Sequence, residues 1–244
     1  MKVFVMIPTY NERENIQDLI HDIFSITDPQ TDSEKGLEIV VVDDNSPDGT
    51  AQLVKDMSMK DSRIHLILRK NEKGRGTAGI RGILYALEKG ADYVVEMDSD
   101  YSHHPVYIPD MLREIQKYDV VIGSRRVHGG GESGRNIIRK LITLFANFYI
   151  RVVMGIHVKD CTSGYRAFRR GVLQSLNLNT MISVGPSIVE EILYACHLRG
   201  YRIKEIPIIF EDRKKGKSTK DLRQYLDTMI KVMKFRLSMK KDVQ

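Results

Sequence analysis

Short apolar runs alternate with amphipathic stretches along the first 123 residues, and this order constrains the fold more than any other feature. The apolar runs lie at residues 2–7, 37–42, 64–68, 93–97 and 120–123, and each has the length of a buried strand. Between them, apolar residues recur every three or four positions, as in the helix expected from about residue 14. This alternation predicts an α/β fold, with a mostly parallel sheet covered by helices on both faces.

The second half of the chain does not continue this alternation. Four glycines between 129 and 134 predict a flexible connector, and an extended piece is expected near Arg166. Later elements are expected as helices at 141–158, 186–199 and from 222, a strand at 202–210 and a basic loop at 211–220. The last helix has an apolar face with basic flanks, which fits core packing and membrane contact equally well.

Composition limits the partners of the protein. The 244 residues carry 38 Lys and Arg against 32 Asp and Glu, and this net charge of +6 favours phosphate-rich partners or an anionic membrane surface. The basic run at 214–220 lacks the interleaved aromatic residues of a nucleic-acid interface, so we expect no nucleic-acid partner. Two cysteines are too few for a disulfide framework and favour a reducing intracellular compartment.

No stretch of the sequence is typical of a membrane-spanning helix. The nearest is 141–158, but a span needs about 20 mostly apolar residues and Asn147, Arg151 and Gly155 interrupt this segment. We therefore expect an amphipathic helix that is buried or lies on a membrane. The amino terminus begins with a strand-like run, so no cleavable signal sequence is expected.

Polar segments follow four of the predicted strands. They are PTYNE at 8–12, DDNSPDGT at 43–50, DSD at 98–100 and GSR at 123–125. Each is typical of a turn when taken alone. Because the carboxyl ends of parallel strands meet at one edge of a sheet, together they predict a nucleotide-sized pocket. A turn at Ser99 would bring the carboxylates of Asp98 and Asp100 towards one divalent cation, which prefers oxygen ligands shared with substrate phosphates.

Further motifs continue this order along nearly the whole chain. They are KGRGTA at 73–78, MDSDYSHHP at 97–105, TSGYR at 162–166, EIPI at 205–208, DR at 212–213 and GKS at 216–218. With the strand-end segments, the set resembles the inverting glycosyltransferases of family 2, which have the GT-A fold. More narrowly, it resembles the dolichol- or polyprenol-phosphate mannose synthases. The resemblance implies one GT-A domain over 1–244, with a nucleotide-sugar-binding half (1–123), an acceptor-side half (124–220) and a basic amphipathic carboxy-terminal helix (221–244).

The resemblance implies that the donor is GDP-mannose, and it assigns residues to the guanosine end. These residues are Pro8, Tyr10, Glu12 and Asp43, with the ring of Tyr10 packed on the base or the ribose.

The same resemblance implies a metal site for Mg²⁺ or Mn²⁺. Asp98, Ser99 and Asp100 would meet the ribose, the diphosphate and the metal, and Asp100 would be the more direct ligand. Ser102 stands where some relatives have a glutamine ligand, so water would complete the coordination there. The two histidines that follow are expected to shape the loop rather than to bind the metal.

Catalytic roles around the acceptor fall on basic residues and one threonine. Arg125 would face the donor sugar and the acceptor phosphate, and Arg139 and Thr143, one helical turn apart, would face the acceptor phosphate. Arg213 would contact the donor diphosphate from the basic loop. The family pattern Gly-x-Ser-Lys is broken here because Lys220 comes one position late, which removes support for a phosphate contact by that lysine.

These residues fit the chemistry of sugar transfer. A divalent cation and arginines stabilise the charge that grows on a leaving phosphate. An acceptor phosphate is largely ionised at neutral pH and needs orientation more than a general base. The expected reaction is transfer of mannose from GDP-mannose to dolichyl or polyprenyl phosphate with inversion. Two alternatives stay open, namely a glucosyltransferase that uses UDP-glucose on the same lipid and a non-catalytic nucleotide-sugar-binding subunit.

A lipid acceptor requires contact with a membrane surface. We expect a peripheral protein on a cytoplasmic membrane face, at the endoplasmic reticulum in a eukaryote or the plasma membrane in a prokaryote. The segment 139–158, the carboxy-terminal helix or small membrane-anchoring subunits would hold it there.

Overall fold

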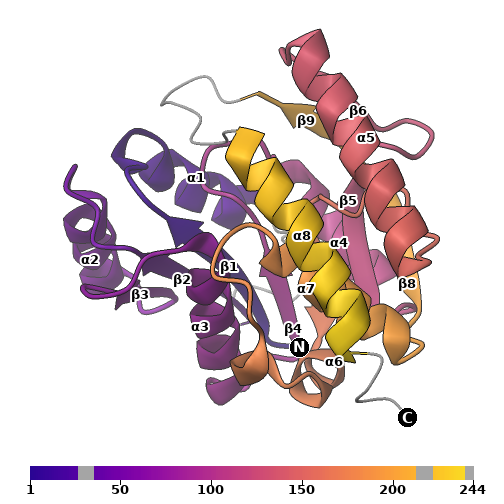
Figure 1. Cartoon of the computed structure of the whole chain (residues 1–244). Coiled ribbons are helices and arrows are strands. Elements are labelled where there is room, and N and C mark those ends of the chain that lie inside the picture. Colours follow the sequence, from indigo (N-terminus) through magenta and orange to yellow (C-terminus); the bar gives the residue numbers. More distant parts are fainter. Residues whose placement is uncertain (27–35, 213–221, 240–244) are drawn as a thin grey trace.

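The computed structural model describes residues 1–26, 36–212 and 222–239 (Figure 1). The strands are β1 (Val3–Thr9), β2 (Leu37–Asp43), β3 (Ile64–Leu68), β4 (Tyr93–Glu96), β5 (Val120–Ser124), β6 (Gly131–Ser133), β7 (Arg166–Arg169), β8 (Ile203–Pro207) and β9 (Ile209–Glu211). The α-helices are α1 (Arg13–Ile26), α2 (Thr50–Lys60), α3 (Arg75–Glu88), α4 (Ile108–Glu114), α5 (Ile137–Met154), α6 (Arg170–Ser175), α7 (Ile188–Leu198) and α8 (Leu222–Met239). Short 3₁₀ helices lie at Pro105–Tyr107 and Leu178–Thr180.

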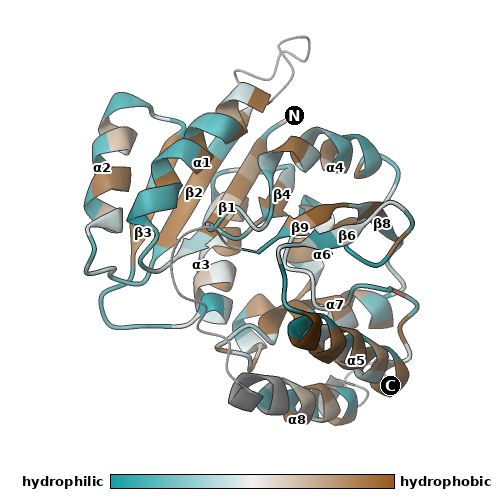
Figure 2. Cartoon of the chain, turned by 90° about the horizontal axis from the view of Figure 1, so that it is seen from above, coloured by the Kyte–Doolittle hydropathy of each residue, from teal (hydrophilic) through white to brown (hydrophobic). Residues whose placement is uncertain are grey.

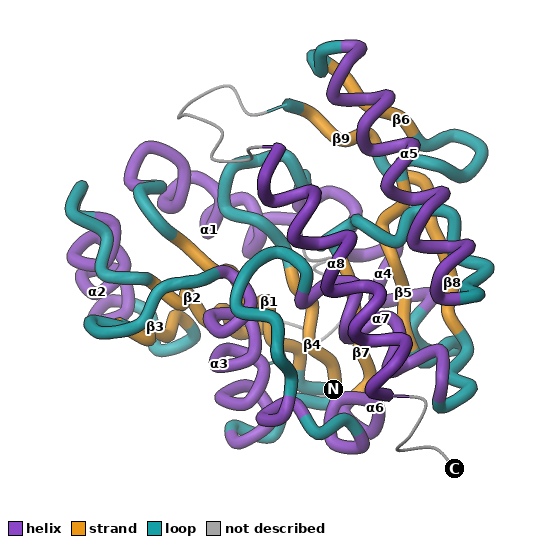
Figure 3. Tube along the Cα trace, in the orientation of Figure 1, coloured by secondary structure: helices purple, strands orange, loops and turns teal. Residues whose placement is uncertain are grey.

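A seven-stranded sheet forms the centre of the molecule, in the order β3-β2-β1-β4-β7-β5-β8. The pairs β1–β2, β1–β4, β2–β3 and β5–β8 are parallel, as the alternation of elements predicted. Strand β7, the extended piece expected near Arg166, lies between β4 and β5 and runs antiparallel to both (Figure 3). The sheet is therefore mostly parallel, and strands from both halves of the chain build it.

Both faces of the sheet are buried under helices. Along β1, Val3, Val5 and Ile7 pack into one apolar cluster with α1, α2 and α4. Phe4 and Met6 point the other way, into a second cluster with α3, α5, α6, α7 and α8. Since successive side chains of a strand point to opposite faces, this division explains why β1 is apolar at nearly every position.

Helix α5 packs one face into the second apolar cluster and leaves an apolar face outside. The side chain of Asn136 caps its amino terminus by accepting a hydrogen bond from the Ile138 backbone N–H, and Gly155 ends it in the left-handed conformation. Its buried side chains are Thr143, Asn147, Ile150 and Met154. Apolar side chains that are more than half exposed are Ile137, Ile138, Leu141, Leu144, Phe145, Phe148 and Val152. Figure 2 shows this helix as a strongly hydrophobic ribbon at the edge of the molecule.

Helix α8 lies beside α5 and contributes to the core. Val232 and Phe235 are completely buried in the second apolar cluster, whereas Ile230, Met233 and Leu237 are exposed. Met233 and Leu237 belong to the apolar face expected from the sequence, so core packing by that face is wrong at these two positions, and the helix packs through Val232 and Phe235 instead. Membrane contact by the exposed side stays a prediction.

Two predictions about the second half were wrong. Residues 202–210 do not form one strand, because β8 ends at Pro207 and Ile209 begins β9, which pairs with β6 in a separate two-stranded sheet. Proline has no backbone N–H to continue a ladder, which explains the change of partner at this point. The glycine-rich connector is likewise not wholly irregular, since Gly131–Ser133 forms β6.

Candidate active site

The polar segments that follow four strands meet at one edge of the central sheet. Strands β1, β2 and β4 are parallel, and β5 runs in their direction because β7 is antiparallel to both β4 and β5. Their last residues, Thr9, Asp43, Glu96 and Ser124, therefore end on the same side. This edge is where open α/β sheets bind ligands.

Asp43 organises the loop after β2 through its own carboxylate. It is completely buried, and it accepts hydrogen bonds from the Ser46 backbone N–H at 2.8 Å and from the hydroxyls of Ser46 and Thr9. These hydrogen bonds from residues at and after the strand end, together with the positive φ of Asn45 and Gly49, fix the path of the loop into α2.

The other residues predicted at the nucleoside end surround the mouth of this loop. Pro8 is buried, and its carbonyl accepts a hydrogen bond from the Ser99 hydroxyl. The ring of Tyr10 is 44% exposed, with the ammonium of Lys73 5.0 Å from its centre. Glu12 donates its backbone N–H to the Thr50 hydroxyl. The exposed aromatic face of Tyr10 is the feature of this group that a planar ligand would contact.

Asp44 and Arg69 tie the loop before α3 to this region, and sequence reasoning missed both. The Arg69 guanidinium donates to Asp44 at 2.7 Å and to the Gly74 carbonyl at 3.1 Å, and both Arg69 and Asp44 are buried. Asp44 also accepts the Gly74 backbone N–H. The adjacent acids in DDNSPDGT and the arginine directly after β3 were the available signals, because they lie where two strands end.

Asp98 faces an arginine from α3 rather than a second carboxylate. Arg75 donates to Asp98 at 3.0 Å and to the buried Glu96 at 2.9 Å. Burial alone would lower the pKa of Arg75, but the charges of Asp98 and Glu96 raise it above its ordinary value. Arg75 lies within the KGRGTA motif, yet nothing in that motif predicted its contact with Asp98. It supplies a fixed positive charge beside Asp98.

His103 is part of the loop architecture. Its ring Nδ1 accepts the Asp98 backbone N–H at 3.1 Å, and its ring stacks on Tyr165 with 5.0 Å between the ring centres. Burial lowers the pKa of His103, which favours the neutral ring that this acceptor role requires. His104 accepts the Val106 backbone N–H through its side chain, as a helix cap. These contacts agree with the prediction that the two histidines shape the loop.

Asp100 lines an acidic pocket of about 280 Å³. Its carboxylate accepts the backbone N–H of Ser102 at 3.1 Å, and both residues are buried. The other lining residues are Glu14, Asn15, Asp18, Tyr101, His104, Glu211 and Asp212. Asp98 is not in this lining, so the two acids of the DSD segment have different surroundings.

The oxygen atoms around Asp100 are of the type that Mg²⁺ and Mn²⁺ accept. Among the described residues, no cluster of three His, Cys, Asp or Glu side chains has the geometry to hold a metal ion by itself. A hard cation at Asp100 fits this arrangement if substrate phosphate oxygens and water supply the remaining ligands.

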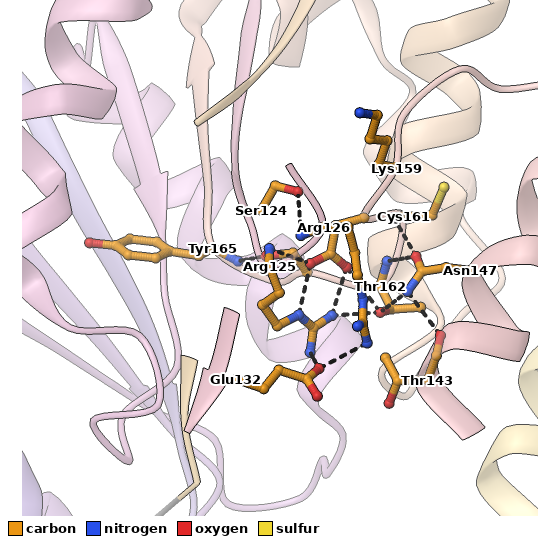
Figure 4. A network of polar contacts seen from close by, with 12 residues as sticks. Ser124, Arg125, Arg126, Glu132, Thr143, Asn147, Lys159, Cys161, Thr162 and Tyr165 are labelled. Carbon is orange, nitrogen blue, oxygen red and sulfur yellow. Dashed lines mark hydrogen bonds and ion pairs between the residues drawn. The ribbon is translucent and has the colours of Figure 1, made fainter. Parts of the chain in front are cut away.

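Arg125, at the end of β5, is held by a polar network (Figure 4). Its guanidinium donates two hydrogen bonds of 2.7 Å to Asp160 and one of 2.7 Å to the Thr162 hydroxyl. Phe210 of β9 lies 5.3 Å from the guanidinium. Burial alone would raise the pKa of Asp160, but the positive charge of Arg125 lowers it below its usual value. These contacts fix the orientation of the Arg125 side chain.

Two acids, Asp160 and Glu132, hold the surrounding arginine side chains in place. Neither acid was predicted from the sequence. Glu132 of β6 accepts from Arg126 at 3.0 Å and from Arg135 at 2.9 Å. Asp160 lies two positions before the first residue of the TSGYR motif, but a single acid in a loop carries no distinctive pattern. Their importance arises from contacts between residues that are distant in the chain.

The predicted acceptor residues lie on α5 and near β9. Arg139 is 44% exposed at its side chain and lies 3.5 Å from Asp212. Thr143, one turn later, is buried and donates its hydroxyl to the Arg139 carbonyl. Arg213 and residues 214–220 of the expected basic loop lie outside the described residues, whereas Glu211 belongs to β9.

Comparison with known proteins gives matches over most of the chain. Residues 4–176 match the family model described as glycosyl transferase family 2. The undecaprenyl-phosphate mannosyltransferase of Micrococcus luteus is 37% identical over 218 residues, which cover 89% of this chain and 87% of that protein. The polyprenol monophosphomannose synthase of Mycolicibacterium smegmatis is 34% identical over 95% of this chain and 85% of that protein.

Solved structures with low sequence identity have the same fold. The mannosyl-3-phosphoglycerate synthase of Rubrobacter xylanophilus has a TM-score of 0.70 and 18% identity, over 100% of this chain and 76% of that one. The glucosyl-3-phosphoglycerate synthase of Mycobacterium tuberculosis, in complex with Mn²⁺ and UDP, has a TM-score of 0.66 and 20% identity, over 97% and 79% of the two chains. The GT-A fold predicted from the sequence is confirmed.

Proposed function

Since the chain belongs to glycosyltransferase family 2, as its motifs predicted, we propose that it transfers mannose from GDP-mannose to a polyprenyl or dolichyl phosphate. An oxygen of the acceptor phosphate attacks C1 of mannose, the bond from C1 to the GDP oxygen breaks, and the anomeric centre inverts. The products are polyprenyl-phosphate mannose and GDP. The observation that carries this proposal is the 37% identity to an undecaprenyl-phosphate mannosyltransferase over 89% of the chain.

The donor would bind across the carboxyl ends of β1, β2 and β4. Pro8, Tyr10, Glu12 and Asp43 would form the guanosine end, where Tyr10 offers its exposed ring.

The diphosphate would lie beside the DSD segment. Asp98 and Ser99 would meet the ribose, the diphosphate and the metal. Asp100 would be the more direct ligand of Mg²⁺ or Mn²⁺, with water completing the coordination at Ser102. When bound, the cation would neutralise charge on the departing GDP. Arg75 already neutralises Asp98, so it lowers the repulsion between that carboxylate and an approaching diphosphate.

The acceptor phosphate would lie between the end of β5 and the start of α5. Arg125, Arg139 and Thr143 would orient it there, and Arg213 would contact the donor diphosphate. Arginine pairs with phosphate through parallel N–H donors, which fixes geometry as well as charge. An ionised phosphate needs no proton removed before it attacks, so orientation supplies much of the rate enhancement.

The lipid tail of the acceptor would reach the protein along α5. Within the described residues, no helix is long and apolar enough to cross a bilayer. The seven exposed apolar side chains of α5 instead form a stripe along the helix, and Arg139 and Arg151 are exposed beside it. Burying this stripe in the acyl boundary of an anionic leaflet would hold the protein as a peripheral enzyme on the cytoplasmic membrane face.

The first experiment is transfer of labelled mannose from GDP-mannose to a short polyprenyl phosphate in vesicles, with Mg²⁺, Mn²⁺ or chelator. Metal-dependent label in the lipid product is the expected result. Label from UDP-glucose instead would overturn the donor assignment. Saturable GDP-mannose binding without transfer, on vesicles that the protein does bind, would favour a non-catalytic subunit. Failure to float with anionic vesicles would indicate that small membrane-anchoring subunits hold the protein.

A further inference from the structure

Asn147 is a buried amide on α5, and every polar atom of its side chain that the structure describes is in use. Its Nδ2 donates to the Thr143 carbonyl at 3.0 Å and to the Thr162 hydroxyl at 3.3 Å. Its Oδ1 accepts the backbone N–H groups of Cys161 at 2.7 Å and Thr162 at 3.3 Å. An amide within a helix normally competes with the helical backbone or faces solvent. This one instead ties α5 to the 160–162 loop.

The Thr162 hydroxyl connects that amide to Arg125. It donates to Asp160 at 3.3 Å, and it accepts from Arg125 at 2.7 Å and from Asn147 at 3.3 Å. A hydroxyl has one donor and two acceptor lone pairs, so these contacts use its whole capacity. The chain of hydrogen bonds from Asn147 through Thr162 to Arg125 is continuous in Figure 4.

We propose that Asn147 and Thr162 are positioning residues, through which helix α5 sets the orientation of the Arg125 guanidinium. Neither side chain needs to touch substrate. The role rests on the proposed function, in which Arg125 and Thr143 face the acceptor phosphate and the outer side of α5 faces the bilayer. The Asn147 amide then contacts the Thr143 carbonyl and also the Thr162 hydroxyl, which accepts a hydrogen bond from Arg125.

The contacts favour a role of Asn147 and Thr162 in orienting Arg125 over a role in merely holding α5 on the rest of the protein. Apolar contacts of Ile150 and Met154 already bury the inner face of α5, and the helix is capped at both ends. Asp160 holds two donors of the Arg125 guanidinium from the loop side, and Thr162 holds the remaining described contact of Nη2. Loss of the Thr162 hydroxyl would therefore remove the side-chain link from the Arg125 guanidinium to the Asn147 amide. The loop itself would stay bound to α5, because Asn147 Oδ1 still accepts the backbone N–H groups of Cys161 and Thr162.

The test compares Thr162→Val, which keeps the shape of the side chain, with Thr162→Ser, which keeps the hydroxyl. With short polyprenyl phosphate in phosphatidylcholine vesicles, Thr162→Val is expected to raise the acceptor KM about tenfold, as loss of a hydrogen bond to a charged group implies. The GDP-mannose dissociation constant stays unchanged, and Thr162→Ser recovers wild-type acceptor KM. Thr180→Val, a distant exposed threonine whose hydroxyl meets only the Asn177 carbonyl among the described contacts, is the matched control.

A second readout follows Arg125 directly and needs no turnover. In ¹⁵N-arginine-labelled protein, with the signal assigned through Arg125→Lys, the guanidinium protons of Arg125 should exchange with water faster in Thr162→Val and in Asn147→Ala. An unchanged exchange rate of the Arg125 guanidinium protons in folded Thr162→Val would overturn the proposal. Equal changes in the GDP-mannose dissociation constant and the acceptor KM that Thr162→Ser does not restore would also overturn it. If wild type transfers no mannose but exchange still rises in the variants, the proposed function fails and the positioning link stands.

Discussion

The carboxylate of Asp160 accepts two hydrogen bonds of 2.7 Å from the guanidinium of Arg125, across a sequence separation of 35 residues. Both side chains are almost fully buried, so each is the counter-charge that makes burial of the other tolerable. This pair fixes the orientation of the Arg125 guanidinium.

Replacing Asp160 by Asn keeps the shape and removes the charge. Since a buried charge without its partner is strongly destabilising, we expect the free energy of unfolding to fall by about 3 kcal/mol. Urea unfolding measures it.

The pH dependence of this difference has a defined direction. The folded-state pKa of Asp160 is lowered, so its stabilising contribution is complete above the unfolded pKa of about 3.9 and is lost as pH falls through the folded value. The gap between wild type and Asp160→Asn should therefore be constant near neutral pH and close in acid. A gap that stays constant below pH ~3 would contradict the ion pair.

Asp100→Ala removes the carboxylate at the acidic pocket and should abolish metal-dependent transfer, by about 100-fold or more, because charge on the leaving diphosphate is no longer neutralised. Initial rates of mannose transfer with Mg²⁺ and Mn²⁺ measure the effect. Asp110→Ala, an exposed acid on α4, is the control that should keep full activity. Normal rates in Asp100→Ala would refute the metal assignment.

Phe148→Glu places a charge on the exposed apolar face of α5. Phe148 is 62% exposed, so we expect little change in thermal stability but about tenfold weaker partitioning to anionic vesicles, from loss of one buried aromatic side chain. Flotation measures the partitioning. Met59→Glu, at an equally exposed apolar position on α2, should bind vesicles as wild type does. Equal losses in both variants would mean that added negative charge, rather than the α5 surface, explains the effect.

Glycine substitutions in two helices should have opposite effects on stability. A Cβ at Gly82 of α3 would lie 2.5 Å from Met6 Cγ and 2.9 Å from a Val42 methyl, so Gly82→Ala should cost about 2 kcal/mol through overpacking against the sheet. A Cβ at Gly171 of α6 meets nothing within 4 Å, so Gly171→Ala should stabilise by about 0.5 kcal/mol. Thermal unfolding of both variants tests the close approach of α3 to β1 and β2. Unchanged thermal stability of Gly82→Ala would show that α3 does not pack this closely against β1 and β2.

Much of the architecture follows from local pattern. Apolar runs such as 2–7 and 37–42 can be satisfied only as strands buried on both faces, and β1 and β2 formed there. The DSD segment lies just after β4 because the apolar run that precedes it forms this strand. By contrast, Pro207 marks where β8 ends, but the pairing of β9 with β6 joins segments that are distant in the chain, and no local pattern predicts it.

The order of strands and helices, the polar edge of the sheet and the family could be predicted from the amino-acid sequence, because they depend on periodicity and on contiguous motifs. Which charges meet follows from the folded arrangement alone. It paired Arg75 with Asp98 and Asp160 with Arg125, inserted β7 antiparallel in the centre of the sheet, and left the apolar side of α5 exposed. Such contacts join residues far apart in the chain, and their energies depend on burial and distance, which exist only once the chain has folded.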